Sequence, residues 1–253
     1  MIRRHFSAFA GIGPTRERMI RAAGISDWQQ FLAAGGVPGL PERVRASVAR
    51  QIGEWTAALE REDAGFFARA VPRSAHWALF EEFGGDVRYL DIETTGLSPG
   101  RDEVTVVGIH DGSRYDVLVR GRGLAGEAIQ DALGDCKLLV TYFGSAFDVP
   151  FLRAAFPDVG WDFPHFDLCF AGRKVGLRGG LKAIERKLGI RRGTSIADID
   201  GFEAVRLWRA HERGHPTALR CRLNGTVSTP GIAIQLDYCR TPAAGIQRSQ
   251  TEG

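Results

Sequence analysis

Two spacings of hydrophobic residues divide the chain. Between Val44 and Leu59 the apolar residues recur every three or four positions, which is the spacing of an amphipathic helix. From Val87 onward they alternate every second position, which is typical of a strand with one buried face. We therefore expect helices over residues 1–83 and a sheet from about residue 87.

Helix boundaries are marked in the first part of the chain. Gly13-Pro14 is expected to open a helix that ends at Ala23-Gly24, because proline favours the first helical position and glycine follows the last. Ser26 with Gln29 has capping-box spacing and predicts the start of a second helix. Two further helices are expected, over roughly 41–62 and 74–83.

The second part predicts an α/β fold. Three strands joined by short connections should pair as an antiparallel meander, and the later strands alternate with helices. This order favours a mixed central sheet flanked by helices, behind a small helical N-terminal region. The expected strands are 87–93, 103–110, 114–119, 138–140 and 166–168, and the expected helices are 124–133, 149–156, 181–188 and 202–212.

Composition changes this picture little. The chain has 253 residues, 44% of them hydrophobic, and a net charge of only +3, which does not indicate a partner by itself. The four cysteines are far apart, so we expect reduced thiols and neither a zinc knuckle nor a disulfide framework. No signal peptide or membrane span is apparent, so we expect a cytoplasmic protein without a membrane partner.

Asp91 and Glu93 are the first candidate catalytic residues. Residues two apart in a strand point to the same side, so these carboxylates should lie together at the edge of the core. Bound Mg²⁺ or Mn²⁺ would relieve their repulsion, although a solvated acidic pair is the alternative for such a short pattern.

Two motifs carry a family resemblance. Residues 89–97, Tyr-Leu-Asp-Ile-Glu-Thr-Thr-Gly-Leu, resemble the first motif of the DEDD, or DnaQ-like, 3′–5′ exonucleases, which have a ribonuclease-H-like fold. Residues 141–152 resemble the second motif, a strand followed by Phe147-Asp148 entering a helix. Three downstream blocks are similar to bacterial ribonuclease-H-like proteins of the YprB type, and this resemblance covers roughly 75–219; the blocks are 165–168, 175–185 and 200–208.

The resemblance implies a two-metal phosphodiester hydrolase that releases nucleotides from a 3′ end. It implies that Asp91 bridges both metals, that Glu93 binds one and positions the water, and that Asp148 holds the second. Nucleic acid, with a single-stranded 3′ end, is the expected partner. The candidate nucleic-acid contacts are Thr94, Gly96, Leu97, Phe147 and Lys182, although a solvated helix end is an equal reading of Lys182. Asp167 is expected to be a cap or turn residue rather than a ligand.

One part of the family pattern is missing. The resemblance requires a late Tyr-x-x-x-Asp helix, but no Asp or Glu occurs between Glu212 and Asp237, and Ala233 stands four before Asp237. Either residues 220–253 are a genuinely divergent terminus, or a reading-frame change near codon 220 replaced the helix. We favour the reading-frame change. With three carboxylates, hydrolysis should be much reduced.

The N-terminal segment offers a second possible contact with nucleic acid. Residues 9–14, Phe-Ala-Gly-Ile-Gly-Pro, are similar to a helix-hairpin-helix, in which Gly11 and Gly13 would let the backbone approach a phosphate. An ordinary helical turn packed on the nuclease domain is the alternative.

We therefore expect a helical region (1–83), a nuclease domain (84–219) and a tail (220–253). A metal-dependent 3′–5′ exonuclease acting on DNA or RNA is the first hypothesis. A catalytically weak nucleic-acid-binding or scaffold module on the same fold is the second. Polynucleotidyl transfer or endonucleolytic cleavage is less favoured, because the residues around both motifs are of the exonuclease type.

Overall fold

The computed structural model describes residues 1–189, so the expected helix 202–212, the tail 220–253, Cys221 and Cys239 lie outside the described residues. Helices occupy the first part, as predicted. α1 (Pro14–Ala22) begins at the proline after Gly13, and α3 (Glu42–Glu60) buries the apolar stripe that includes Val48, Ile52 and Trp55. The other elements here are η1 (Ile2–Arg4), α2 (Trp28–Ala33) and α4 (Ala64–Ala70).

Two expectations in this region were wrong in detail. Asp27, and not Ser26, caps α2, because the Asp27 carboxylate accepts the backbone N–H of Gln30 at 2.9 Å. The expected helix 74–83 is a 3₁₀ helix, η2 (Arg73–Leu79), followed by one turn of α5 (Phe80–Phe83). Residues three apart, such as Ala75 and Ala78, are both buried in η2, and this repeat suits three residues per turn.

A five-stranded mixed sheet follows a short turn, η3 (Gly84–Asp86), in the strand order β3-β2-β1-β4-β5. β1 and β2 are antiparallel, as are β2 and β3, whereas β4 runs parallel to β1, and β5 to β4. This is the predicted α/β architecture. The strands are β1 (Val87–Thr94), β2 (Val104–His110), β3 (Tyr115–Val119), β4 (Leu138–Thr141) and β5 (His165–Asp167).

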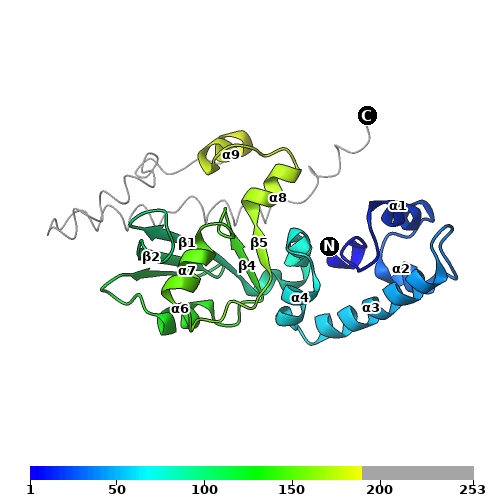
Figure 1. Cartoon of the computed structure of the whole chain (residues 1–253), viewed down its shortest axis with the longest axis horizontal. Helices are drawn as coiled ribbons and strands as arrows, with labels where there is room; N and C mark the ends of the chain where they lie inside the picture. The colour runs from blue at the N-terminus through cyan, green and yellow to red at the C-terminus, as the bar shows by residue number, and fades with distance from the viewer. Residues whose placement is uncertain (190–253) are drawn as a thin grey trace.

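Helices connect and flank the later strands. α6 (Gly126–Leu133) and α7 (Asp148–Ala155) cover one face of the sheet, where Leu90 and Ile92 meet Phe151 (Figure 1). α8 (Leu168–Lys174) directly follows β5 and was not predicted, and α9 (Leu181–Leu188) has the expected bounds. Leu168, expected in the last strand, is the first residue of α8, because the Asp167 carboxylate caps this helix at the backbone N–H of Cys169.

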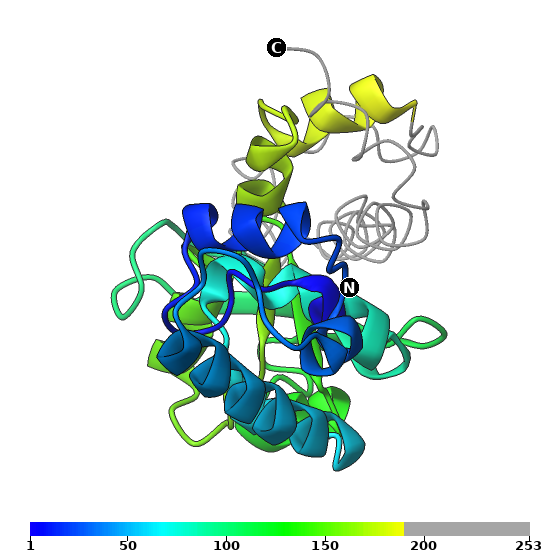
Figure 2. The ribbon, with the colours of Figure 1, turned by 90° about the vertical axis from the view of Figure 1, so that its right-hand side faces the viewer.

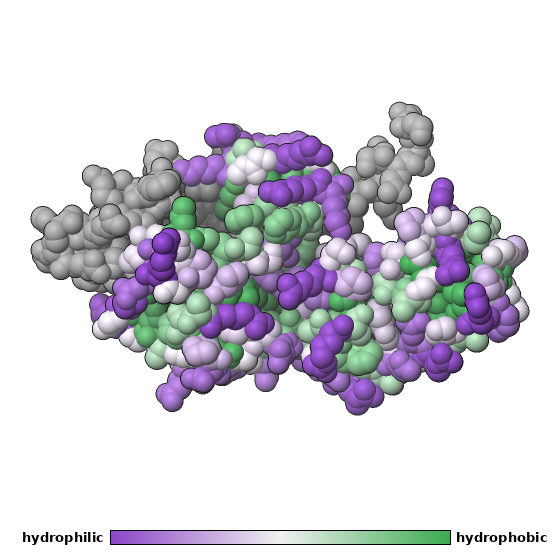
Figure 3. Space-filling model, in the orientation of Figure 1, coloured by the Kyte–Doolittle hydropathy of each residue, from purple (hydrophilic) through white to green (hydrophobic). Residues whose placement is uncertain are grey.

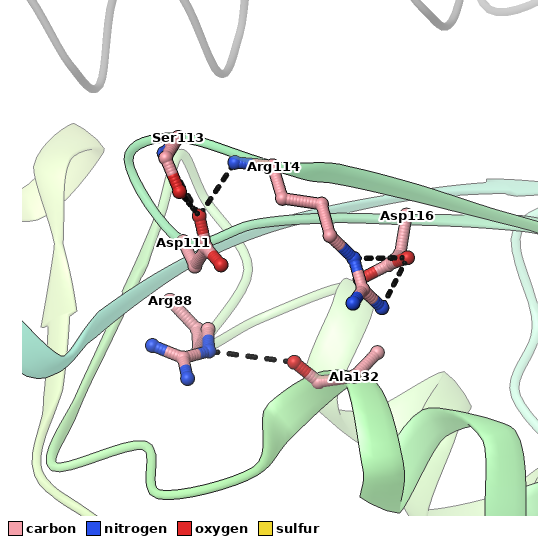
Figure 4. A network of polar contacts seen from close by, with 6 residues as sticks. All are labelled: Arg88, Asp111, Ser113, Arg114, Asp116 and Ala132. Carbon is pink, nitrogen blue, oxygen red and sulfur yellow. Dashed lines mark hydrogen bonds and ion pairs between the residues drawn. The ribbon is translucent and has the colours of Figure 1, made fainter.

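The turn between β2 and β3 is closed by its own side chains (Figure 4). The Asp111 carboxylate accepts hydrogen bonds from the backbone N–H groups of Ser113 and Arg114, which lower the pKa of Asp111 to about 2. Arg114 in turn binds Asp116 in β3 through two of its nitrogens. These bonds close the hairpin of β2 and β3, in which Gly108 lies opposite Val117.

The N-terminal helices share a hydrophobic core with the sheet. One continuous cluster joins Phe31, Trp55 and Phe67 of the helices to Tyr89 and Val140 of the strands. The helices extend from one end of the sheet, as Figure 1 shows along the long axis and Figure 2 from that end. The two parts are therefore packed against each other through apolar contacts.

Two further observations concern the cysteines and the possibility of a membrane span. Cys136 and Cys169 are buried free thiols, as expected for reduced cysteines. Within residues 1–189, no helix is both long and apolar enough to span a membrane.

Candidate active site

β1 presents two carboxylates on one side of the sheet. Asp91 lies opposite Gly108 of β2, and Glu93 lies opposite Val106, so both carboxylates belong to the same face. Gly108 has no side chain, and a Cβ atom built on it would come within 2.3 Å of the Tyr115 hydroxyl. The side chain of Tyr115 therefore fills the space beside the row that contains Asp91.

Asp148 reaches the same strand from a different element. It is the first residue of α7, only 4% exposed, and its Oδ1 atom accepts the backbone N–H of Ile92 at 3.0 Å. β4 pairs with β1 only as far as Tyr89, so Asp148 takes the place of a neighbouring strand for the N–H group of Ile92. This bond joins the two sequence motifs, which are 56 residues apart.

Burial and like charge raise the pKa values of these carboxyl groups. The pKa of Asp91 rises to about 7, first because of burial and then because of the negative charge of Glu93. The pKa of Asp148 is well above its usual value, again because of burial and then because of Asp91. The charged neighbours that raise these pKa values are themselves carboxylates, so a cation between them would lower the free energy of the site.

The chemistry of these donors suits a hard divalent cation. Carboxylate oxygens are the ligands that Mg²⁺ and Mn²⁺ prefer, and the electrostatic coupling joins Asp91 to both Glu93 and Asp148. Among residues 1–189, however, no group of three or more His, Cys, Asp and Glu side chains is arranged to hold an ion. The structure thus brings the three predicted carboxylates into one neighbourhood without a closed ligand cage.

Asp167 is a structural anchor, as expected of a cap. Besides capping α8, its carboxylate accepts the backbone N–H groups of Phe143 and Ser145, each at 2.9 Å. It therefore holds the loop between β4 and α7 against the end of β5. Asp167 also contributes to the raised pKa of Asp148, a proximity that no spacing in the sequence indicated.

The loop after β1 is tightly folded around Gly96. The Thr94 hydroxyl donates to the carbonyl oxygen of Gly96 at 2.5 Å, and a Cβ atom on Gly96 would lie 2.5 Å from the carboxyl group of Asp102. Asp102 needs that position because its Oδ2 atom accepts the backbone N–H of Ser98 at 2.8 Å. Leu97, 73% exposed, extends from this loop into solvent.

The other residues that the sequence predicted to contact nucleic acid lie in different parts of the structure. Phe147 is partly buried and packs against Phe151 of the core, with ring centroids 4.9 Å apart, and Lys182 lies in the first turn of α9. Gly11 and Gly13 precede α1, at the far end of the long axis from the sheet (Figure 1). The structure therefore does not bring these two glycines to the carboxylates.

One exposed residue of this region was not singled out from the sequence. Phe143, in the loop anchored by Asp167, is 42% exposed and has a φ of +68°, which is unusual for a bulky residue. A phenylalanine at that position gives no signal of a left-handed backbone, because glycine and asparagine are the residues that normally mark one.

A family model of the RNase H superfamily matches residues 88–223, which include both motifs and all of β1 except its first residue. This chain belongs to the RNase H superfamily. The match covers more than half of the 253 residues and agrees with the ribonuclease-H-like sheet described above. The search of curated proteins found no match.

Solved structures with a partly similar fold include two nucleases and a polymerase. A family B DNA polymerase from the archaeon Pyrobaculum calidifontis is 20% identical, with a TM-score of 0.43, over 59% of this chain and 24% of its own. A nuclease described only as an apo form is 23% identical, with a TM-score of 0.40, over 60% and 72%. Brucella melitensis NrnC with bound Mg²⁺ is 20% identical, with a TM-score of 0.36, over 64% and 91%. This chain thus spans about a quarter of the polymerase.

Proposed function

We propose that this RNase H superfamily member is a metal-dependent 3′–5′ exonuclease that hydrolyses phosphodiester bonds of DNA or RNA. One observation carries the proposal: Asp148 at the start of α7 is bonded to Ile92 of β1, between Asp91 and Glu93. The two motifs that resemble the DEDD exonucleases supply these carboxylates, and the downstream blocks are similar to proteins of the YprB type. The same resemblance favours the 3′ direction and a single-stranded end.

In this proposal Asp91, Glu93 and Asp148 hold Mg²⁺ or Mn²⁺. When bound, such ions supply an activated water and stabilise the leaving oxygen. Asp91 and Asp148 must then be deprotonated, which the bound positive charge favours over their raised pKa values. Glu93 orients the attacking water, and the loop with Thr94, Gly96 and Leu97 receives the end of the strand.

The test is hydrolysis of single-stranded DNA and RNA labelled at one end, with Mg²⁺, Mn²⁺ or EDTA. We expect stepwise shortening from the 3′ end that EDTA abolishes and that Asp91→Asn and Asp148→Asn each reduce at least about 100-fold. Asp131→Asn, which removes an exposed acid from α6, is the matched control and should leave the rate unchanged. Metal-dependent degradation that survives Asp91→Asn would place the activity elsewhere.

A second candidate is a catalytically weak nucleic-acid-binding module on the same fold. The sequence favours it at one point, since no Tyr-x-x-x-Asp pattern follows Glu212. In that case the chain would bind oligonucleotides without shortening them. The gene's nucleotide sequence adds a separate check, because an alternative frame that encodes the missing motif after codon 220 would explain the loss.

A further inference from the structure

Two aromatic rings lie against each other on the surface beside the carboxylates. Phe143 and Phe170 are 42% and 41% exposed, with centroids 5.9 Å apart and ring planes inclined by 31°. Phe143 belongs to the loop after β4, and Phe170 to the first turn of α8. Two phenylalanines in contact with water lose part of the free energy that burial would give them, so the arrangement calls for a reason.

The backbone of Phe143 is held in a costly conformation. Its φ of +68° lies in the left-handed region, which a bulky residue rarely adopts. Asp167 fixes this conformation by accepting the N–H groups of Phe143 and Ser145. Glycine or asparagine would fit the same turn with less strain. We therefore infer that the turn has a phenylalanine because its aromatic ring is needed at the surface.

A positive charge completes the surface. The guanidinium group of Arg173 lies 5.2 Å from the ring centroid of Phe170, and both Arg173 and Lys174 are in the last turn of α8. Hydrophobic and hydrophilic residues accordingly lie side by side over α8 in Figure 3. An aromatic face next to a guanidinium group matches a nucleobase next to its phosphate.

The position of the rings relates them to the candidate active site. β1, β4 and β5 are parallel, and β4 pairs with β1 only as far as Tyr89. Asp91, the Phe143 loop and Asp167 therefore all lie toward the carboxyl ends of these strands. Asp167 binds the Phe143 loop and also raises the pKa of Asp148, so the loop and the carboxylates are neighbours.

We propose that Phe143 and Phe170, together with Arg173, form a stacking platform for an unpaired nucleobase of a single-stranded nucleic acid. The proposal rests on the proposed nuclease function for its substrate class, but it concerns binding and not hydrolysis. The rings take the base, and Arg173 takes an adjacent phosphate. Because any base has an aromatic face, the platform binds without sequence preference.

The test uses the full chain in EDTA and a single-stranded oligonucleotide with 2-aminopurine near its 3′ end. Stacking should quench the fluorescence on binding, and an oligonucleotide with an abasic site there should bind more weakly. We expect Phe143→Asn and Phe170→Ala to weaken binding of the intact oligonucleotide roughly 5- to 100-fold and to remove the quenching, and Phe143→Tyr to retain both. Leu32→Ala, which truncates an exposed leucine in α2, is the control and should bind as the wild type does.

Stability separates this role from a structural one. Phe143→Asn relieves the left-handed strain, so its midpoint of urea unfolding should be equal to or higher than that of the wild type while its binding falls. Equal binding of intact and abasic oligonucleotides by the wild type, no binding at all, or unchanged quenching in Phe143→Asn would each overturn the platform. If the platform is overturned in this way but the chain still hydrolyses oligonucleotides, the proposed nuclease function is retained. If the fluorescence is quenched but no hydrolysis occurs, the platform is retained and the nuclease function is not.

Discussion

At the residue scale, two histidines show how polar groups join the helical region to the sheet. The backbone N–H of His165 in β5 donates to Nδ1 of His76 at 2.9 Å. Nε2 of His76 must then carry the proton that bonds the carbonyl oxygen of Val71 at 3.0 Å, so His76 is neutral. The side chain of His165 lies 2.8 Å from the Thr141 hydroxyl of β4.

We predict that His165 makes the protein less stable as the pH falls. Burial is the main cause that lowers its pKa to about 4; the charge of Asp167 opposes this shift, and the charge of Arg73 adds to it. The unfolded chain therefore binds the proton first, and the free energy of unfolding decreases from about pH 6.5 down to pH 4, by up to about 3 kcal/mol. His165→Gln should show a correspondingly flatter pH dependence in urea unfolding.

In the comparison of the wild type with His165→Gln, the contributions of the other titrating groups cancel. Asp91 and Asp148, whose pKa values are raised, act in the opposite direction, but they are present in both proteins. The packing cost of the substitution is read at pH 8, where His165 is neutral. Parallel curves for the two proteins would show that His165 titrates normally and would contradict the prediction.

At the element scale, periodicity predicted the sheet well because each strand has a regular environment. The bounds of β1 and β2 were placed within one residue, since burial of one face gives alternation in β1 and burial of both faces gives a nearly continuous apolar run in β2. α4 and α8 were missed, because each has only seven residues, and α8 begins without a turn after β5. The carboxylate pair of β1 was predictable by the same alternation.

Contacts between elements that are far apart in the sequence could not be predicted from the spacing of hydrophobic residues. The bond from Ile92 to Asp148 depends on where β4 stops pairing with β1, which no local spacing records. The same holds for Asp167, whose bonds to Phe143 and Ser145 depend on the adjacency of β4 and β5. The motif resemblance supplied the three carboxylates, whereas the surroundings of Phe143 had to come from the structure.

We predict that the loop between β1 and β2 requires Gly96 for function more than for stability. A methyl group there would displace the Asp102 carboxylate, break its bond to Ser98 and move Leu97. Gly96→Ala should lower hydrolysis or oligonucleotide binding about tenfold, and should change the free energy of unfolding by about 1 kcal/mol or less.

Two variants test the cause. In Gly96→Ala/Asp102→Ala the clashing carboxylate is absent. Adding Asp102→Ala to Gly96→Ala should therefore lower activity and the free energy of unfolding only a little more. Gly53→Ala places the same methyl group in open space within α3, where it should stabilise by about 1 kcal/mol and leave activity unchanged. Full activity of Gly96→Ala would show that the position of Leu97 does not matter.

At the scale of the whole molecule, the shared core bears on how the chain divides into domains. The expected boundary at residue 83 separates the helices from the sheet in sequence, but one apolar cluster crosses it. Val87, Tyr89 and Val140 in the strands belong to the same cluster as Trp55 and Phe67 in the helices. Removing the helices would therefore expose apolar surface on the sheet.

We predict that residues 84–253 alone do not fold as stably as the same residues in the full chain. Loss of the partner helices exposes large buried side chains, each of which contributes about 1.5–3 kcal/mol when fully buried. The fragment should unfold at a lower urea concentration than the full chain, or associate through the uncovered face, which light scattering would detect. Substituting Phe67 by Ala in the full chain serves as the graded control, because it weakens the same contact without removing the helices and should cost about 3–5 kcal/mol. A monomeric fragment with the midpoint of the full chain would establish residues 84–253 as an independent folding unit, with the helices as an attached module.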